Sequence, residues 1–294
     1  MSLCSAISDR RRRLLAGLFA LTLLLSGCGR LFFLPESGHR WDPADADIVY
    51  EDVWFEAADG VRLHAWFLPV DEQPARGSVL FLHGNAENVS THIASVYWLP
   101  ERGYNVLMLD YRGFGLSGGS PDFAGVHRDA EAALAVLAEH EATDPERIIV
   151  FGQSLGAAVA ITLVGQAGER YGVRGLVADS PFTSYRGIAR EKFGEFWLTW
   201  PFQWPLSLTV SDRFAPRDFI GEVSPVPLLL LAGEADTIVP MHHAEALYEK
   251  AREPKTLWRL RHAGHIQSMA FEEVRRELVA WMDEVIGNEA RAER

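Results

Sequence analysis

From residue 48 onward, short apolar runs alternate with longer stretches in which apolar residues recur about every 3.6 positions. The short runs are nearly continuous and rich in valine, isoleucine and leucine, as strands buried on both faces are. We predict strands of this kind at 78–82, 105–109, 148–151, 176–178 and 226–231, and a last strand at 255–260. We predict helices at 122–140, 155–167, 242–252 and 268–286. This alternation predicts an α/β fold, with a mainly parallel sheet flanked by helices.

Two segments depart from this rhythm. Residues 48–56 and 61–69 alternate apolar and polar positions around Asp59-Gly60, a hairpin signal, and predict an antiparallel sheet edge. Residues 181–224 contain no clear strand and are rich in aromatic side chains. We therefore predict an aromatic-rich lid insertion at about 182–224. The aromatic residues in question are Phe196, Trp197, Trp200, Phe202 and Trp204.

The composition is that of a globular protein, with 48% hydrophobic and 23% charged residues among 294. One α/β domain over residues 48–290 accommodates this length. Forty acidic against 28 basic residues give a net charge of −12, which disfavours nucleic acid as a partner. Two cysteines, Cys4 and Cys28, are too few for a thiolate zinc cluster.

The N-terminus has the pattern of a targeting segment. Four arginines at 10–13 precede an apolar run at 14–25 that is too short for a transmembrane helix. The run ends in Leu-Ser-Gly-Cys28, which resembles the bacterial lipoprotein signal. That resemblance implies cleavage after residue 27 and lipidation of Cys28. The alternatives are an uncleaved membrane anchor and a plain secretory signal in which Cys28 has no role.

On the lipoprotein interpretation the protein is lipid-anchored in the cell envelope, and the membrane is its partner. The residue after Cys28 is Gly29 and not an aspartate. In the enterobacterial sorting pattern this favours the periplasmic side of the outer membrane. Residues 28–47 then form a tether to the domain. The apolar start of this tether, residues 31–35, is expected either to rest in the lipid interface or to pack on the domain.

A candidate nucleophile follows the predicted strand 148–151. Gly152-Gln153-Ser154-Leu155-Gly156 is a GxSxG sequence between that strand and a helix rich in small residues. A sharp strand-to-helix turn requires glycine near the serine and exposes its hydroxyl. We therefore predict that Ser154 is the nucleophile of a serine hydrolase.

The nucleophile needs a base, and the base needs an acid. His265 follows the last predicted strand, and Asp236 follows the strand 226–231, so the chain order is Ser, Asp, His, as this fold requires. His262 is the competing base and Glu234 is the competing acid. Both are disfavoured because they lie nearer to the ends of their strands. Asp236 has the further interpretation of a cap for the next helix.

A tetrahedral intermediate needs amide donors. His83-Gly84-Asn85 follows the strand 78–82, and we assign the backbone amides of Asn85 and Leu155 to the oxyanion hole. The His83 side chain, beside glycine in this loop, is expected to hold the turn together.

These motifs together resemble the α/β-hydrolase family, and in particular its small serine hydrolases of the HGNxxN/GxSxG type. Further matching segments are 110–117, which resembles the family's DxRGxGxS loop, and 179–182 before the lid. In that loop Arg112 is expected to brace neighbouring turns, and Tyr111 to do the same or to contact substrate. Glu87 stands where relatives often have glycine, which predicts an acidic group near the site that disfavours some anionic substrates.

The triad predicts acyl transfer to water without a cofactor. The lid aromatics are expected either to line an acyl pocket, giving an ester or thioester hydrolase for a small-molecule or lipid-like acyl substrate, or only to pack the lid on the domain. The alternatives are an aminopeptidase or acylaminopeptidase-like amide hydrolase and a non-catalytic membrane-anchored interaction protein. No metal is expected, because His242 and His243 are adjacent in a helix and should point about 100° apart.

Overall fold

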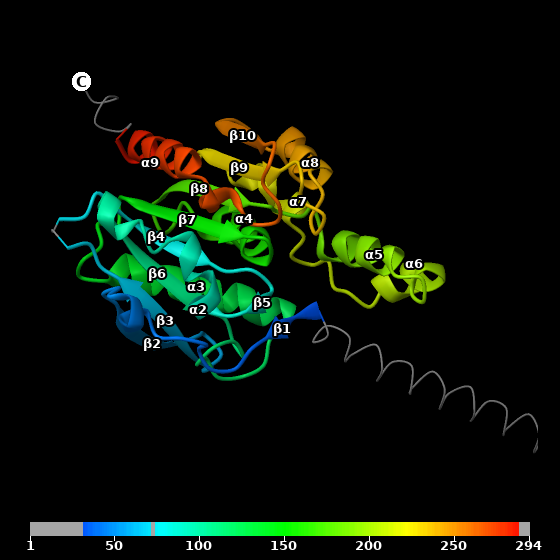
Figure 1. Cartoon of the computed structure of the whole chain (residues 1–294), viewed down its shortest axis with the longest axis horizontal. Helices are drawn as coiled ribbons and strands as arrows, with labels where there is room; N and C mark the ends of the chain where they lie inside the picture. The colour runs from blue at the N-terminus through cyan, green and yellow to red at the C-terminus, as the bar shows by residue number, and fades with distance from the viewer. Residues whose placement is uncertain (1–31, 72–73, 288–294) are drawn as a thin grey trace, which may run out of the picture.

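The computed structural model describes residues 32–71 and 74–287. At their centre is an eight-stranded sheet in the order β10-β9-β8-β7-β4-β6-β3-β2 (Figure 1). The strands are β1 (Leu34–Pro35), β2 (Glu51–Glu56), β3 (Arg62–Leu68), β4 (Gly77–Leu82), β5 (Ala86–Glu87), β6 (Tyr104–Asp110), β7 (Ile148–Gln153), β8 (Val173–Asp179), β9 (Leu228–Gly233) and β10 (Lys255–Leu260). The α-helices are α2 (Val89–His92), α3 (Phe123–Glu139), α4 (Leu155–Ala167), α5 (Tyr185–Glu195), α6 (Gln203–Ser207), α7 (Pro216–Phe219), α8 (His242–Lys250) and α9 (Glu272–Gly287).

The sheet has the mixed pattern that the sequence predicts. β2 pairs antiparallel with β3 from Glu51↔Phe67 to Glu56↔Arg62, which confirms the hairpin, and β3 pairs antiparallel with β6. All other neighbours in the sheet are parallel. The carboxyl ends of β4, β7, β8 and β9 therefore meet at one edge, where parallel α/β sheets place their ligands.

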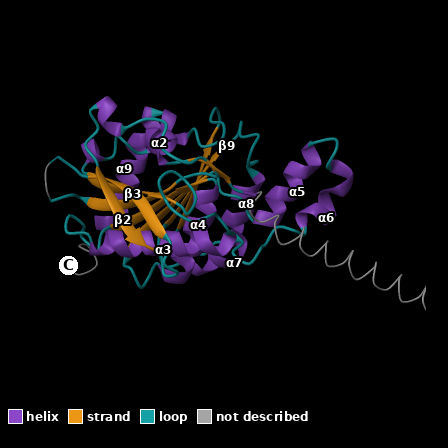
Figure 2. Ribbon diagram, turned by 90° about the horizontal axis from the view of Figure 1, so that it is seen from below, coloured by secondary structure: helices purple, strands orange, loops and turns teal. Residues whose placement is uncertain are grey.

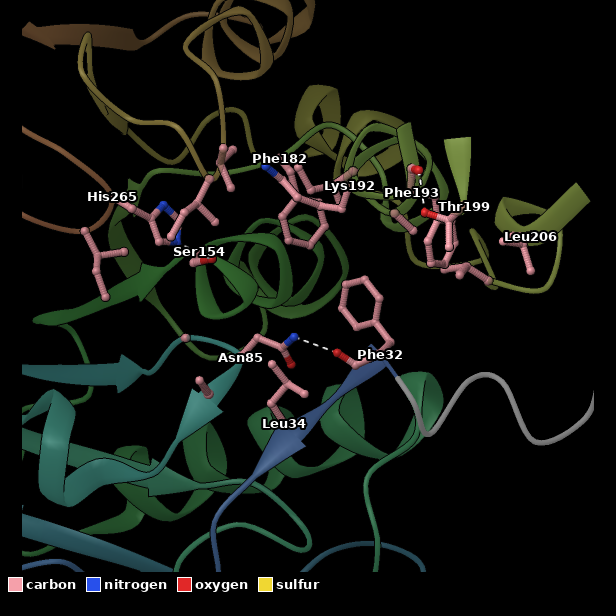
Figure 3. A pocket seen from close by; sticks show the side chains of 18 of the residues that line it. Phe32, Leu34, Asn85, Ser154, Phe182, Lys192, Phe193, Thr199, Leu206 and His265 are labelled. Carbon is pink, nitrogen blue, oxygen red and sulfur yellow. Dashed lines mark hydrogen bonds between the residues drawn. The ribbon is translucent and has the colours of Figure 1, made fainter. Parts of the chain in front are cut away.

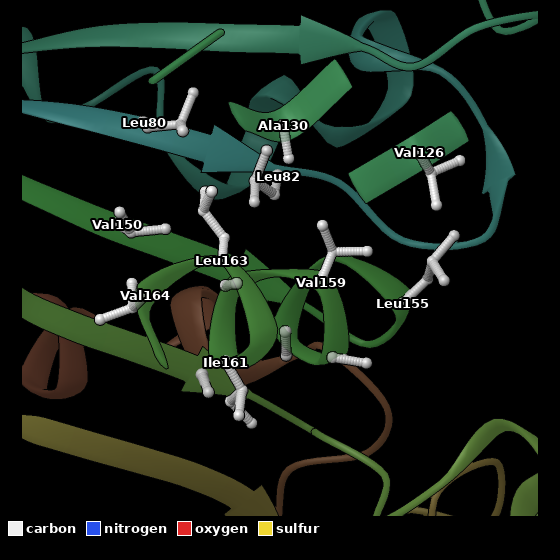
Figure 4. Close-up of a cluster of buried hydrophobic side chains, with 14 of the residues drawn as sticks. Leu80, Leu82, Val126, Ala130, Val150, Leu155, Val159, Ile161, Leu163 and Val164 are labelled. Atoms are coloured by element: carbon white, nitrogen blue, oxygen red, sulfur yellow. The ribbon is translucent and has the colours of Figure 1, made fainter. Parts of the chain in front are cut away.

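Helices cover both faces of the sheet because the strand side chains alternate between two apolar cores. On β4, Leu80 and Leu82 join one core with α3 and α4, while Val79 and Phe81 join the other core with α2 and α9 (Figure 2). In the first core α4 presents aliphatic side chains to β4 and β7 (Figure 4). Both faces of the central strands are thus buried, which explains their continuous apolar sequences.

The interval 181–224 contains no strand, as predicted. α5 and α6 project from the body of the molecule (Figures 1 and 2). The chain then returns to the body: Thr162 Oγ1 of α4 donates to the Phe214 carbonyl (3.1 Å), and Ile220 is fully buried. The projecting lid is therefore the first part of the predicted insertion.

The described part of the predicted tether, residues 32–47, packs on the domain. β1 pairs in parallel with β5 (Leu34↔Ala86), and Phe33 is buried. Of the two expectations for residues 31–35, the structure shows packing for residues 32–35. Residues 1–27 and Cys28 lie outside the described residues. Within the described ranges, no helix combines the length and apolarity needed to cross a bilayer.

One buried histidine makes the fold sensitive to acid. His127 of α3 stacks on Phe214 and contacts the Tyr185 hydroxyl (3.1 Å), and burial lowers its pKa to about 3. The unfolded chain binds this proton near pH 6.5, so acidification between pH 6.5 and 3 favours unfolding. We expect His127→Phe to reduce the loss of unfolding free energy between pH 7.5 and 5 by about 2 kcal/mol. Urea titrations at both pH values measure this difference, and an unchanged loss in the variant would contradict the prediction.

Candidate active site

Ser154 sits on a strained turn between β7 and α4. Its backbone has φ 54° and ψ −111°, a conformation that non-glycine residues rarely adopt. The flanking glycines are required by contact: a Cβ on Gly156 would lie 1.9 Å from the Leu82 carbonyl oxygen, and one on Gly152 would lie 2.2 Å from that of Gly156. The Ser154 N–H donates to the Asp179 carbonyl (2.8 Å), which ties the turn to the end of β8.

The structure brings Ser154, His265 and Asp236 together. His265 Nε2 lies 3.0 Å from Ser154 Oγ, and His265 Nδ1 lies 2.8 Å from Asp236 Oδ2. A proton on Nδ1 is donated to Asp236, so Nε2 is free to accept the serine hydroxyl proton. Ser154 and His265 face each other at the wall of a cavity (Figure 3). The three side chains therefore have the geometry that acyl transfer requires.

The Asp236 carboxylate binds the base and its own turn, but it does not cap the next helix, α8, whose N-cap residue is Met241. Oδ2 binds His265, while Oδ1 accepts the N–H groups of Ile238 (2.8 Å) and Val239 (2.9 Å). Burial alone would raise its pKa, but the bonds from His265 and the two amides outweigh burial, and the pKa is lowered. The carboxylate is thus held in its charged form.

The competing residues lie elsewhere. Glu234 and His262 are both exposed, and neither lines the cavity. Glu234 lies two positions before Asp236, and His262 lies three positions before His265. Both are therefore still close to the ends of their strands, β9 and β10.

The two predicted amide donors adjoin the serine. Asn85 lines the cavity with Ser154, and Leu155 is the first residue of α4, where amides have no acceptor within the helix. The N-terminal segment binds Asn85 through two hydrogen bonds. The side-chain Nδ2 of Asn85 donates to the Phe32 carbonyl (2.6 Å; Figure 3), and the backbone carbonyl of Asn85 accepts the Leu34 N–H (3.2 Å). The segment that follows Cys28 therefore positions this loop.

Two residues of the recognised motifs have structural roles, as expected. His83 is fully buried, its Nδ1 bonds to the Gly84 carbonyl oxygen (2.7 Å), and burial lowers its pKa to about 3. Arg112 forms a bidentate pair with Asp59 and bonds to Asp129 (2.7 Å), so it braces the hairpin against α3. Tyr111 is buried and does not line the cavity.

The cavity beside Ser154 has a volume of about 660 Å³ and a mainly apolar wall (Figure 3). Its lid side consists chiefly of Ile188, Ala189, Phe193, Leu206 and Val210. Phe32 and Leu34 complete the opposite side. The sequence did not predict that Phe32 and Leu34 line the cavity. It showed only that the run 31–35 is apolar, without indicating where that run packs.

The five clustered aromatic residues of the lid fulfil neither expectation made for the lid aromatics, whereas Phe182 and Phe193 do line the cavity. Phe196, Trp197, Trp200, Phe202 and Trp204 are all exposed, and none lines the cavity. They lie on α6 and on the link between α5 and α6, whereas the cavity wall on the lid side is mainly aliphatic apart from Phe193. The lid therefore contributes to the cavity wall, but not through the cluster of exposed aromatic side chains.

Glu87 does not place its charge in the cavity. Its carboxylate pairs with Arg40 (2.9 Å), and Glu87 is absent from the cavity wall. The expected effect on anionic substrates is therefore not supported. Its backbone φ of 66° lies in the left-handed region, which favours glycine.

Asp179 is a buried carboxylate that sequence analysis left without a role. It accepts bonds from Ser268 Oγ (2.7 Å) and Gln153 Nε2 (3.0 Å), and burial raises its pKa. Its neighbour Ser180 accepts the Ile266 N–H (3.3 Å). The end of β8 therefore connects the serine turn with the loop that carries His265.

The prediction that the side chains of His242 and His243 point about 100° apart was wrong. Both rings converge on Glu191 of α5, with Nε2–carboxylate distances of 3.4 and 3.1 Å, because the rings stack at the start of α8. The Thr183 N–H donates to His243 Nδ1 (3.2 Å), so the ring proton lies on Nε2 and is donated to Glu191. This pattern favours a hydrogen-bonded link between lid and body over a metal site.

The sheet order and the serine turn after β7 define an α/β-hydrolase fold, and the chain belongs to the α/β-hydrolase family. The family model described as "Serine aminopeptidase, S33" matches residues 73–216. These findings support a hydrolase.

Individual proteins are similar over most of the chain. YfhR of Escherichia coli O157:H7 is 40% identical over 224 residues, which cover 75% of this chain and 75% of that protein. The α/β hydrolase domain-containing protein WAV2 of Arabidopsis thaliana is 35% identical over 217 residues, covering 71% and 69%. The structure of the Pyrococcus furiosus esterase Pf2001 aligns with a TM-score of 0.68 and 26% identity, covering 87% of this chain and 97% of the esterase.

Proposed function

We propose that the protein is a serine hydrolase that cleaves carboxylic ester or thioester bonds through an acyl-enzyme intermediate. The observation that carries this proposal is the continuous contact from Ser154 through His265 to Asp236 at the wall of an apolar cavity. Ser154 attacks the acyl carbon as His265 takes its proton, and the amides of Asn85 and Leu155 receive the oxyanion. His265 then protonates the leaving group, and water releases the acid by the reverse steps.

The cavity wall favours acyl esters over aminoacyl amides. A free α-amino group is cationic and needs a nearby carboxylate, yet no Asp or Glu is among the described residues that line the cavity. Its charged side chain is the cationic Lys192, which donates to Glu195 (2.7 Å) and to the Thr237 carbonyl (3.1 Å). The aminopeptidase alternative therefore lacks a site for the substrate's amino group, although the matching family model carries that name.

We also propose that Cys28 is lipidated and that the enzyme is anchored in the cell envelope. The support is the lipoprotein-like sequence before Cys28. Entry of radiolabelled palmitate into the wild type, and its loss in Cys28→Ala, is the expected result in cells.

Acyl-chain length tests the cavity as the acyl site. Ala189 lines the cavity and Ala270 is exposed outside it, so Ala270→Leu is a matched control for Ala189→Leu. We expect Ala189→Leu to lower kcat/KM for p-nitrophenyl octanoate about tenfold while acetate hydrolysis changes less than about twofold. The control should leave both unchanged, and aminoacyl p-nitroanilides should be poor substrates. Preference for the anilides, or equal effects of the two variants, would contradict the proposal.

A further inference from the structure

The outer surface of the lid has an unusual composition for an acidic protein. Residues 196–211 contain no charged side chain, although 23% of the whole chain is charged. Within this stretch Trp197, Trp200 and Trp204 are 77%, 61% and 65% exposed. Phe196, Leu198, Phe202 and Leu208 are exposed as well. Such a concentration of exposed apolar side chains in one short segment is typical of an interaction site, and tryptophan in particular favours the bilayer interface.

This surface is continuous with the mouth of the cavity. Thr199, Leu206 and Thr209 of the same stretch line the cavity, so the lid has an inner wall and an exposed outer surface. Leu34 and Ile238 belong to the cavity wall and are 61% and 51% exposed, so they form an apolar rim. A layer that covered the lid surface would therefore also cover the entrance.

The N-terminal chain enters at the base of the same lid. The Phe32 ring lies 5.6 Å from that of Tyr185, the first residue of α5. Cys28 is four positions before Phe32, so an extended chain keeps it within about 14 Å of the cavity wall. The apolar run 14–25 lies a further three positions upstream. Either form of anchor, a lipid on Cys28 or the uncleaved run, thus brings the bilayer to the lid side of the molecule.

We propose that the exposed lid surface of residues 196–208 docks on the phospholipid bilayer, so that the cavity receives acyl esters directly from the lipid phase. The substrate part of this proposal rests on the proposed function, whereas the docking part does not. Attachment is mainly apolar, because the stretch carries no charge and the whole chain has a net charge of −12. Docking should therefore persist at high salt and need no anionic lipid.

The docking part is tested with the full-length protein reconstituted in phosphatidylcholine vesicles with and without brominated acyl chains, which quench nearby tryptophan. The test variant carries Trp197→Phe, Trp200→Phe and Trp204→Phe. The control is Trp54→Phe, which removes a 42% exposed tryptophan from the distant edge strand β2. We expect bromolipid quenching in the wild type and the control, and the loss of most of it in the triple variant. Equal quenching in all three proteins would overturn the proposal. The proposal would also be overturned if bromolipid did not quench the lid tryptophans and they became shielded from solvent only as the protein concentration rises. That result would indicate that a second copy of the chain covers the lid.

The substrate part is tested with one set of variants and two substrates. Replacing Trp197, Trp200 and Trp204 by serine should lower hydrolysis of a long-chain ester embedded in vesicles about tenfold. Hydrolysis of soluble p-nitrophenyl acetate should change less than about twofold, because none of the three residues lines the cavity. Equal loss on both substrates would refute delivery through the lid surface. No hydrolysis of either ester by the wild type would refute the proposed function instead, while the quenching result would still decide docking.

Discussion

Replacing His265 by alanine is expected to lower kcat for ester hydrolysis by about 10⁴- to 10⁶-fold, with little change in KM. The imidazole is the group in contact with Ser154 Oγ (3.0 Å), and without it the hydroxyl proton has no acceptor as the nucleophile attacks. Substrate contacts with the apolar cavity remain, so ground-state binding should be retained. Steady-state kinetics with p-nitrophenyl esters measure both quantities.

The neighbouring histidine supplies the matched control. His262→Ala removes an exposed imidazole from the same loop and should keep kcat within about twofold of the wild type. A large loss in His262→Ala together with a small loss in His265→Ala would reverse the assignment of the base.

Substituting Asp236 by asparagine is expected to lower kcat by about 10³- to 10⁴-fold. An amide nitrogen in place of Oδ2 would donate to His265 Nδ1 and favour the tautomer with its proton on Nε2, which cannot accept the serine proton. The asparagine oxygen can still accept the amides of Ile238 and Val239, so the turn should remain intact. Circular dichroism and kcat measured on the same preparation separate the two effects.

For this prediction the control is Glu234→Gln, which neutralises the exposed carboxylate two positions earlier. We expect kcat to stay within about twofold of the wild type. If Glu234→Gln proved the more damaging change, Asp236 would not be the acid that orients His265.

The sheet and the catalytic geometry could be predicted because local patterns determine them. Continuous apolar runs located β4, β6, β7 and β9 to within a few residues, since strands buried on both faces carry few polar side chains. Ser154 and Asp236 each follow such a run, His265 follows the partly buried edge strand β10, and the parallel arrangement brings the strand ends to one edge.

Contacts between segments distant in sequence could not be predicted in the same way. Phe32 and Asn85 are 53 positions apart, and no local pattern indicates that the carbonyl of one accepts the side-chain amide of the other. The same limit applies to the lid. An aromatic-rich sequence predicted an apolar element, but which side chains face the cavity depends on how α5 and α6 are placed over it.

Side-chain direction at helix starts is a second source of error. The 100° rule for neighbouring helical residues describes Cα–Cβ vectors, whereas the imidazoles of His242 and His243 extend far enough to stack and to reach the same Glu191 carboxylate. At Glu87, the positive φ is a backbone conformation that favours glycine, and the partly exposed carboxylate pairs with Arg40 instead of lining the cavity.

Covalent labelling by a fluorophosphonate tests the central claim most directly, because the probe reacts with a serine only when a base activates it. The full-length protein in detergent, with Ser154→Ala in parallel, would be labelled, digested and analysed by mass spectrometry. We predict a single adduct on the peptide that contains Ser154, absent from the variant, with ester hydrolysis lost in proportion to labelling. Hydrolysis that continues in Ser154→Ala, or an adduct on another serine such as Ser180, would contradict the assignment of Ser154 as the nucleophile.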